Sequence, residues 1–166
     1  MELIERELRL WTEKVLDVAV DGFGGLPPCP YARRAWLDNK VTVFETDYLP
    51  FVLARQAFFD PESDTLEIVV WFNKEGLEID EFNKWIDDHN EDCGGVWLMG
   101  FHPDAGDDAL TPEFEGLTEK PYGLIFVQSL KHLVFASQRL FKAGYYNQYP
   151  EKDMQFVLRR NEQCVA

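Results

Sequence analysis

Cys29 stands at a point in the chain where a thiol could become reactive. Pro30 follows it, and proline is favoured at the first helical position, so residues 29–36 predict a short helix with Cys29 at its N-cap. A helix N-terminus carries partial positive charge that stabilises a thiolate, and Arg33 and Arg34 add to it. We therefore expect Cys29 to act as a nucleophile or an anion-facing thiol. The competing interpretation is a half-buried cysteine that only caps the helix.

A second candidate, His102-Pro103-Asp104, follows the predicted strand 96–101. Open α/β sheets place their ligands beyond the C-terminal ends of their strands. His102 is accordingly predicted to be a general acid–base or a metal ligand, with Asp104 as its orienting partner or as a second ligand. The alternative, which the sequence does not separate from this one, is a histidine that only bonds the backbone of its loop.

Other acidic residues and motifs give weaker signals. Asp104, Asp107 and Asp108 offer oxygen ligands for a divalent cation, but they lack the regular alternation of an EF-hand loop, which favours a solvated loop. The predicted helix face formed by Asp87, Asp88, Glu91 and Asp92 is likewise expected to be solvated rather than to bind a cation. Since the chain has no P-loop, dinucleotide fingerprint or nucleophile elbow, it indicates no particular cofactor.

Charge and composition exclude several classes of function. The 166 residues carry a formal net charge of -14, a field that repels phosphate backbones, so no nucleic-acid partner is expected. No apolar run is long enough to span a membrane, and the N-terminus lacks the apolar core of a signal peptide. The three cysteines (Cys29, Cys93 and Cys164) are odd in number and far apart, which is typical of reduced thiols in a cytoplasmic protein.

The periodicity predicts an α/β or α+β fold for residues 1–166 as a single domain. Helical spacing runs through residues 4–18, 48–59, 77–90, 121–143 and 151–162, and strands are expected at 41–46, 65–72 and 96–101. Residues 124–127 fit either a fourth strand or the start of the helix. Because helix-sized segments separate the strands, we expect a small, mainly parallel sheet of three or four strands packed with helices.

Several segments together resemble a bacterial family catalogued as domain of unknown function number 1415. The matching residues are the Cys-Pro-Tyr-Ala turn at 29–32, Phe-His-Pro at 101–103, Pro-Tyr at 121–122 and Arg-Asn at 160–161, as well as Phe82-Asn83 and Gly95-Val96. The resemblance implies a shared architecture and supplies no activity. The Cys-Pro-Tyr turn is also similar to the active-site turn of glutaredoxins and glutathione transferases, over about ten residues.

The leading hypothesis is a small cytoplasmic enzyme or small-molecule binder with a joint site of Cys29, His102 and Asp104. The chemistry would be thiol chemistry or metal-assisted hydrolysis, with His102 and Asp104 as the metal ligands. The rival hypothesis is a non-catalytic protein whose acidic surface meets a basic partner. It is motivated by the charge and by aromatic residues near Tyr145 and Tyr149, and it predicts an apolar surface patch or a symmetric homo-oligomer interface.

Overall fold

Helices surround a four-stranded sheet in the part of the chain that the computed structural model describes, which is residues 2–105 and 121–163. None of the helices in these ranges combines the length and the apolar content that a bilayer crossing needs. The helices are α1 (Glu2–Trp11), α2 (Ala32–Leu37), α3 (Phe51–Phe58), α4 (Ile79–Asn90), α5 (Leu130–Lys142) and α6 (Glu151–Gln163).

The sheet is mixed. β1 (Val41–Thr46) pairs in parallel with β2 (Leu66–Trp71), while β4 (Gly123–Ser129) lies between β2 and β3 (Val96–Phe101) and is antiparallel to both. The α/β class is confirmed, and three of the four strands run in the same direction. The expectation that β2 and β3 would be parallel neighbours is wrong, because β4 is inserted between them.

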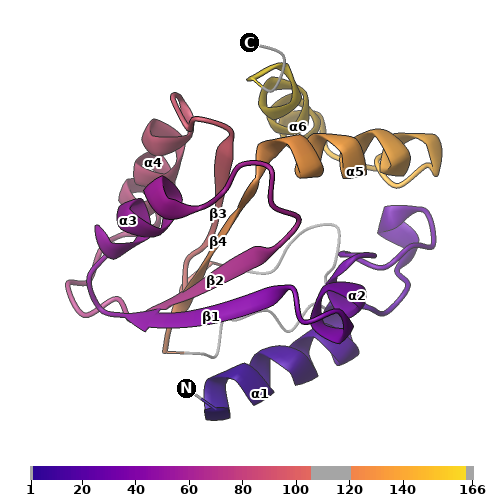
Figure 1. Cartoon of the computed structure of the whole chain (residues 1–166). Helices are drawn as coiled ribbons and strands as arrows, with labels where there is room; N and C mark the ends of the chain where they lie inside the picture. Colours follow the sequence, from indigo (N-terminus) through magenta and orange to yellow (C-terminus); the bar gives the residue numbers. More distant parts are fainter. Residues whose placement is uncertain (1, 106–120, 164–166) are drawn as a thin grey trace.

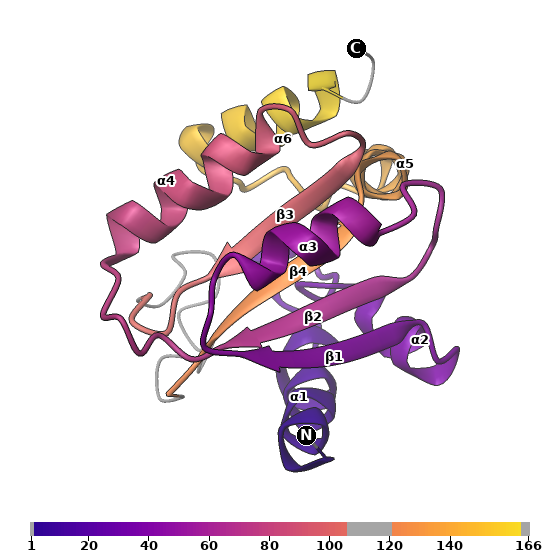
Figure 2. The ribbon, with the colours of Figure 1, turned by 60° about the vertical axis from the view of Figure 1, so that its left-hand side comes forward.

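The helices cover the two faces of the sheet unequally. α3 and α4 lie side by side on one face (Figure 2), where Val69, Phe82 and Leu98 form the centre of the larger core cluster. On the opposite face, α1 and α2 pack over β1 and β2 through a second cluster that contains Leu8 and Trp36. α5 and α6 lie at the end of the sheet where β4 stops (Figure 1). The second face is therefore covered from its two ends by different pairs of helices.

The predicted first helix is present but changes form at Thr12. The hydroxyl of this buried residue donates to the carbonyl oxygen of Leu8 at 2.9 Å and accepts from Trp36 Nε1 at 3.0 Å. A threonine that bonds back to the preceding turn disturbs the regular helical ladder. Residues Thr12–Leu16 form a π-helical turn. The Thr12–Trp36 bond ties this turn to α2.

The predicted helix at 121–143, in which the periodicity left residues 124–127 open, divides into a strand and a helix at Ser129. The alternative of a fourth strand is confirmed, and α5 begins immediately after β4. Ser129 caps α5, since its Oγ accepts the backbone N–H of His132 at 3.3 Å, and it also donates to the Pro61 carbonyl at 2.6 Å. The cap ends the strand and begins the helix at one residue.

Candidate functional site

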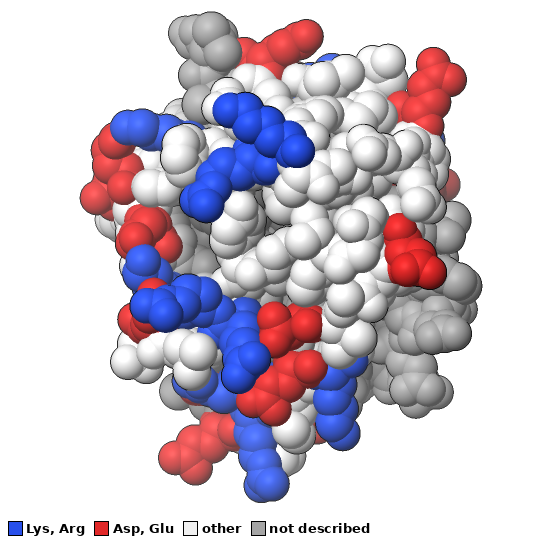
Figure 3. Space-filling view, turned by 90° about the vertical axis from the view of Figure 1, so that its right-hand side faces the viewer, with Lys and Arg blue, Asp and Glu red and all other residues white. Residues whose placement is uncertain are grey.

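A cavity of about 780 Å³ opens on the face of the sheet that α3 and α4 leave uncovered. Half-buried apolar side chains of three strands, Leu66, Met99 and Phe126, form its floor. Its walls come from α1 and α2 on one side and from α5 and α6 on the other. Figure 3 looks onto this side of the molecule, where a largely uncharged surface is hollowed beside groups of Lys and Arg side chains.

The cavity exists because two helix pairs cover the same face without meeting over its centre. Under α1 and α2 the sheet is closed by buried side chains such as Val70 and Leu124. Under α5 it is closed by Trp97, which packs on Leu130 and Val134. No described helix fully covers the strand positions between these two clusters, so their half-buried side chains line an open space.

Gln128 brings a hydrogen-bonding group to the floor of this cavity. It lies on β4, paired across the sheet with Leu66 on β2 and with Trp97 on β3. Its side-chain amide makes no hydrogen bond to any other residue of 2–105 or 121–163, although most polar groups in a protein interior are bonded. The amide is available to a ligand as both donor and acceptor.

Arg160 places a positive charge in the wall formed by α6. The residue is 5% exposed, and its Nη2 donates to Ser137 Oγ on α5. Ser137 Oγ in turn bonds the Tyr146 hydroxyl at 3.1 Å. The remaining contacts of the guanidinium are 3.4 Å bonds from Nε and Nη2 to Asn161 Oδ1. All of these partners are uncharged, so within the described residues the buried guanidinium has no carboxylate beside it.

The other basic side chains that line the cavity differ from Arg160. Arg34 Nε lies 2.8 Å from Asp38 Oδ2, and Lys40 Nζ lies 2.5 Å from Asp64 Oδ2, so each has its own carboxylate. Arg139 is exposed and lies over the ring of Phe135, 6.0 Å from its centroid. Arg160 is thus the one buried basic group of this lining for which the described residues supply no counter-ion.

Cys29 also lines this cavity, but it is not the N-cap of α2. The cap is Tyr31, and the carbonyl of Cys29 accepts the N–H of Ala32 at 3.1 Å, so α2 begins two residues later than expected. Burial raises the pKa of the Cys29 thiol, and hydrogen bonds from the backbone of Tyr31 and Ala32 offset this only in part. The predicted thiolate is therefore not favoured here. At neutral pH the geometry favours a protonated, half-buried thiol.

His102 is buried on the other face of the sheet. Its ring contacts the edges of Trp71 and Phe82, at centroid distances of 5.9 and 5.4 Å, in the core under α4. Nδ1 accepts the backbone N–H of Asp104 at 3.1 Å, and Nε2 lies 2.8 Å from the carbonyl oxygen of Leu77. These two bonds require a neutral ring with its proton on Nε2. Both nitrogens are used to hold backbone, which is the alternative that the sequence left open.

The structure brings Asp104 close to His102 but leaves Cys29 apart from both. Asp104 Oδ2 is 3.9 Å from His102 Nδ1, too far for a hydrogen bond, and its carboxylate is 81% exposed. Cys29 lies in the cavity, whereas His102 is not among the described residues that line it. Because the sheet separates the two, the geometry does not assemble the joint site predicted from the sequence.

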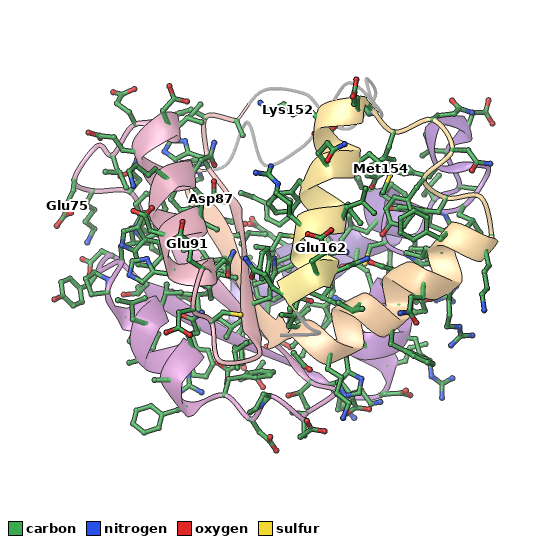
Figure 4. All side chains as sticks on the ribbon, turned by 90° about the horizontal axis from the view of Figure 1, so that it is seen from above. Glu75, Asp87, Glu91, Lys152, Met154 and Glu162 are labelled. Atoms are coloured by element: carbon green, nitrogen blue, oxygen red, sulfur yellow. The ribbon has the colours of Figure 1, made fainter. Side chains whose placement is uncertain are left out.

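A metal centre is likewise without support from the described part of the chain. Residues 2–105 and 121–163 contain no group of three His, Cys, Asp or Glu side chains placed to hold an ion. The predicted oxygen ligands Asp107 and Asp108 lie outside the described residues, as does Cys164. The side chains of Asp87, Asp88, Glu91 and Asp92 are solvent-exposed as expected; Figure 4 labels Asp87, which lies on α4, and Glu91, which follows the last residue of that helix.

The aromatic residues that follow α5 pack inward. Tyr145 is 5% exposed, stacks on Phe23 at a centroid distance of 4.8 Å and donates its hydroxyl to the Pro28 carbonyl. Tyr146 and Tyr149 contact each other and Tyr145. This cluster closes one end of the cavity, and Tyr145 is not the exposed aromatic residue that the interaction hypothesis assumed.

Sequence reasoning missed Arg160, Gln128 and Ser137. A signal for Arg160 was present, because an arginine three residues after Val157 continues the buried face of α6, where an apolar residue is expected. Gln128 and Ser137 had no comparable signal. Their role depends on which strands and helices become neighbours.

The buried acidic groups predict a loss of stability in alkaline solution. Burial raises the pKa of Cys29 above its ordinary value of 9.0, and burial also raises the pKa of Tyr145 above 10.0. Each group stabilises the fold fully below the pKa it has when unfolded, and this contribution is lost as pH rises towards the folded value. We expect the free energy of unfolding to fall above about pH 9, by up to about 1.4 kcal/mol per pH unit for each group.

Urea denaturation at a series of pH values would measure this effect. Cys29→Ala should flatten the curve from about pH 9, and Tyr145→Phe should flatten it from about pH 10. Tyr48→Phe, which removes a phenol that is 61% exposed, serves as the control. If the free energy of unfolding of both Cys29→Ala and Tyr145→Phe depends on pH in the same way as that of the wild-type protein, the prediction is wrong.

Comparison with known proteins gives no match to this chain among family models, curated proteins or solved structures. The resemblance to the family of domain of unknown function number 1415 therefore stays a prediction.

Proposed function

We propose that this chain binds a small molecule in the cavity between its two helix pairs. The observation that carries the proposal is the cavity itself, about 780 Å³ in volume, which combines an apolar floor with the unbonded Gln128 amide and the buried Arg160 guanidinium. Ligand sites in proteins are typically about 300–1,000 Å³, mainly apolar, with a few polar groups that orient the ligand.

The proposal is one of binding rather than of thiol or metal-assisted catalysis. Cys29 faces the cavity, but burial favours its protonated form, which is a poor nucleophile. His102 would have to release a backbone partner before it could move a proton or hold a metal. In residues 2–105 and 121–163, no acid–base side chain lies within hydrogen-bond distance of either group to activate it, and Asp104 Oδ2 remains 3.9 Å from His102 Nδ1.

The location and the partners of the protein are part of the same proposal. A cytoplasmic location is supported by Cys29 and Cys93, which are both free thiols, as is usual in a reducing compartment. The formal net charge of -14 supports the expectation that no nucleic acid binds.

Binding of N-phenyl-1-naphthylamine, a neutral apolar dye that fluoresces in apolar surroundings, tests the proposal. We expect one saturable site per chain. Ala136→Trp and Ala35→Trp introduce an indole into opposite walls of the cavity. Each should weaken the affinity by about ten-fold or more, because the indole occupies volume that the dye would otherwise fill and the two cannot overlap without strain. Fluorescence titration gives both the stoichiometry and the affinity.

The matched control is Ala54→Trp, which places the same side chain on the exposed side of α3, outside the cavity. Circular dichroism and melting temperature establish that each variant is folded. If the dye does not bind, or if it binds folded forms of all three tryptophan variants with the wild-type affinity, the cavity is not a ligand site.

A further inference from the structure

The unneutralised charge of Arg160 indicates what kind of molecule the cavity accepts. Its guanidinium is almost completely buried, and Nη1 has no hydrogen-bond acceptor among the described residues. A buried charge is costly unless an opposite charge accompanies it. We propose that the natural ligand is an apolar monocarboxylic acid whose carboxylate pairs with Arg160 and whose body lies on the floor of the cavity. This inference rests on the proposed function.

The charges around the cavity support a single negative charge on the ligand. Arg34 and Lys40 are each neutralised by a carboxylate, and Arg139 is exposed. Asp153 also lines the cavity on α6, but it lies seven residues from Arg160, a rise of roughly 10 Å along the helix. The single buried guanidinium of Arg160, which has no counter-ion among the described residues, therefore calls for a ligand with a single carboxylate. A doubly charged anion would leave one charge uncompensated in a protein whose formal net charge is already -14.

The groups around Arg160 fix its position without neutralising it. Ser137 Oγ accepts from Nη2, and the bond between Ser137 and Tyr146 orients that hydroxyl. Because Nε and Nη2 already donate to Asn161 and Ser137, the guanidinium is held in place and the N–H groups of Nη1 are left to donate a charge-assisted hydrogen bond to a carboxylate oxygen. The Leu66, Met99 and Phe126 side chains of the floor supply the apolar surface for the rest of the molecule.

Competition between decanoate and decan-1-ol for the dye site tests the inference. The two molecules share one alkyl chain and differ in the charge of the head group. With the wild-type protein at pH 7.5, decanoate should displace N-phenyl-1-naphthylamine at a concentration about ten-fold or more below that of decanol, because hydrogen bonds to a charged partner are the stronger kind. Arg160→Gln should abolish this preference while the dye itself still binds.

Arg159→Gln is the matched control, since it removes an exposed charge from the same helix outside the cavity lining, and it should keep the preference. Equal displacement by decanoate and decanol from the wild-type protein overturns the inference, even if Arg160→Gln does not fold. The inference is also overturned if folded Arg160→Gln keeps the preference for decanoate over decanol. The same holds if Arg139→Gln removes that preference instead. These outcomes leave the dye site intact, whereas failure of the proposed function is recognised by the absence of dye binding.

Discussion

Replacing Phe82 with alanine is expected to lower the free energy of unfolding by about 3–5 kcal/mol, the usual cost of emptying the volume of a buried phenylalanine. The ring is fully buried and stacks on Trp71 at a centroid distance of 5.1 Å. It also fills the space above Gly100, where a Cβ would lie 2.7 Å from the Phe82 ring. Because β3 has a glycine at this position, it offers no side chain that could move into the cavity left by the Phe82 ring. Urea denaturation would measure the loss.

Phe58→Ala provides the control, because Phe58 is 81% exposed on α3 and its replacement should change the free energy of unfolding by less than about 0.5 kcal/mol. Similar losses for the two variants would contradict the packing described for α4.

Replacing His102 with alanine is expected to lower the free energy of unfolding by about 2–4 kcal/mol. The change removes the acceptor of the Asp104 N–H and one donor to the Leu77 carbonyl. It also empties the space beside the stacked rings of Trp71 and Phe82, where the imidazole packs edge-wise against both. Asn73 Nδ2 still donates to Leu77 at 2.8 Å, which keeps the loss below that of Phe82→Ala.

This substitution distinguishes the structural from the functional interpretation of His102. A structural histidine predicts a lower melting temperature with unchanged dye affinity and unchanged metal content of the purified protein. His89→Ala, which alters a half-buried histidine of α4 outside the cavity lining, controls for the general effect of losing an imidazole. Unchanged stability together with the loss of a bound metal would restore the acid–base or metal-ligand role predicted from the sequence.

Periodicity and local chemistry determined most of the secondary structure. The strands at residues 41–46 and 96–101 have the predicted limits, because β-branched and aromatic runs between turn residues favour strands in any context. The predicted helix at 77–90 begins at Ile79, where Glu78 and Glu81 form a capping box. Residues 124–127 were ambiguous, since short apolar runs satisfy both periods until neighbouring strands offer hydrogen bonds.

The sequence by itself determined the α/β class, the formal net charge of -14 and the identity of the residues capable of chemistry. Only the tertiary structure decided which of them meet. Insertion of β4 between β2 and β3 placed Gln128 on the floor of the cavity, and the sheet separated Cys29 from His102. Packing of α6 against α5 buried Arg160 beside Ser137. The physical reason is that helix and strand periods depend on near neighbours in the chain, whereas burial, counter-ions and pKa values depend on residues that lie far apart in it.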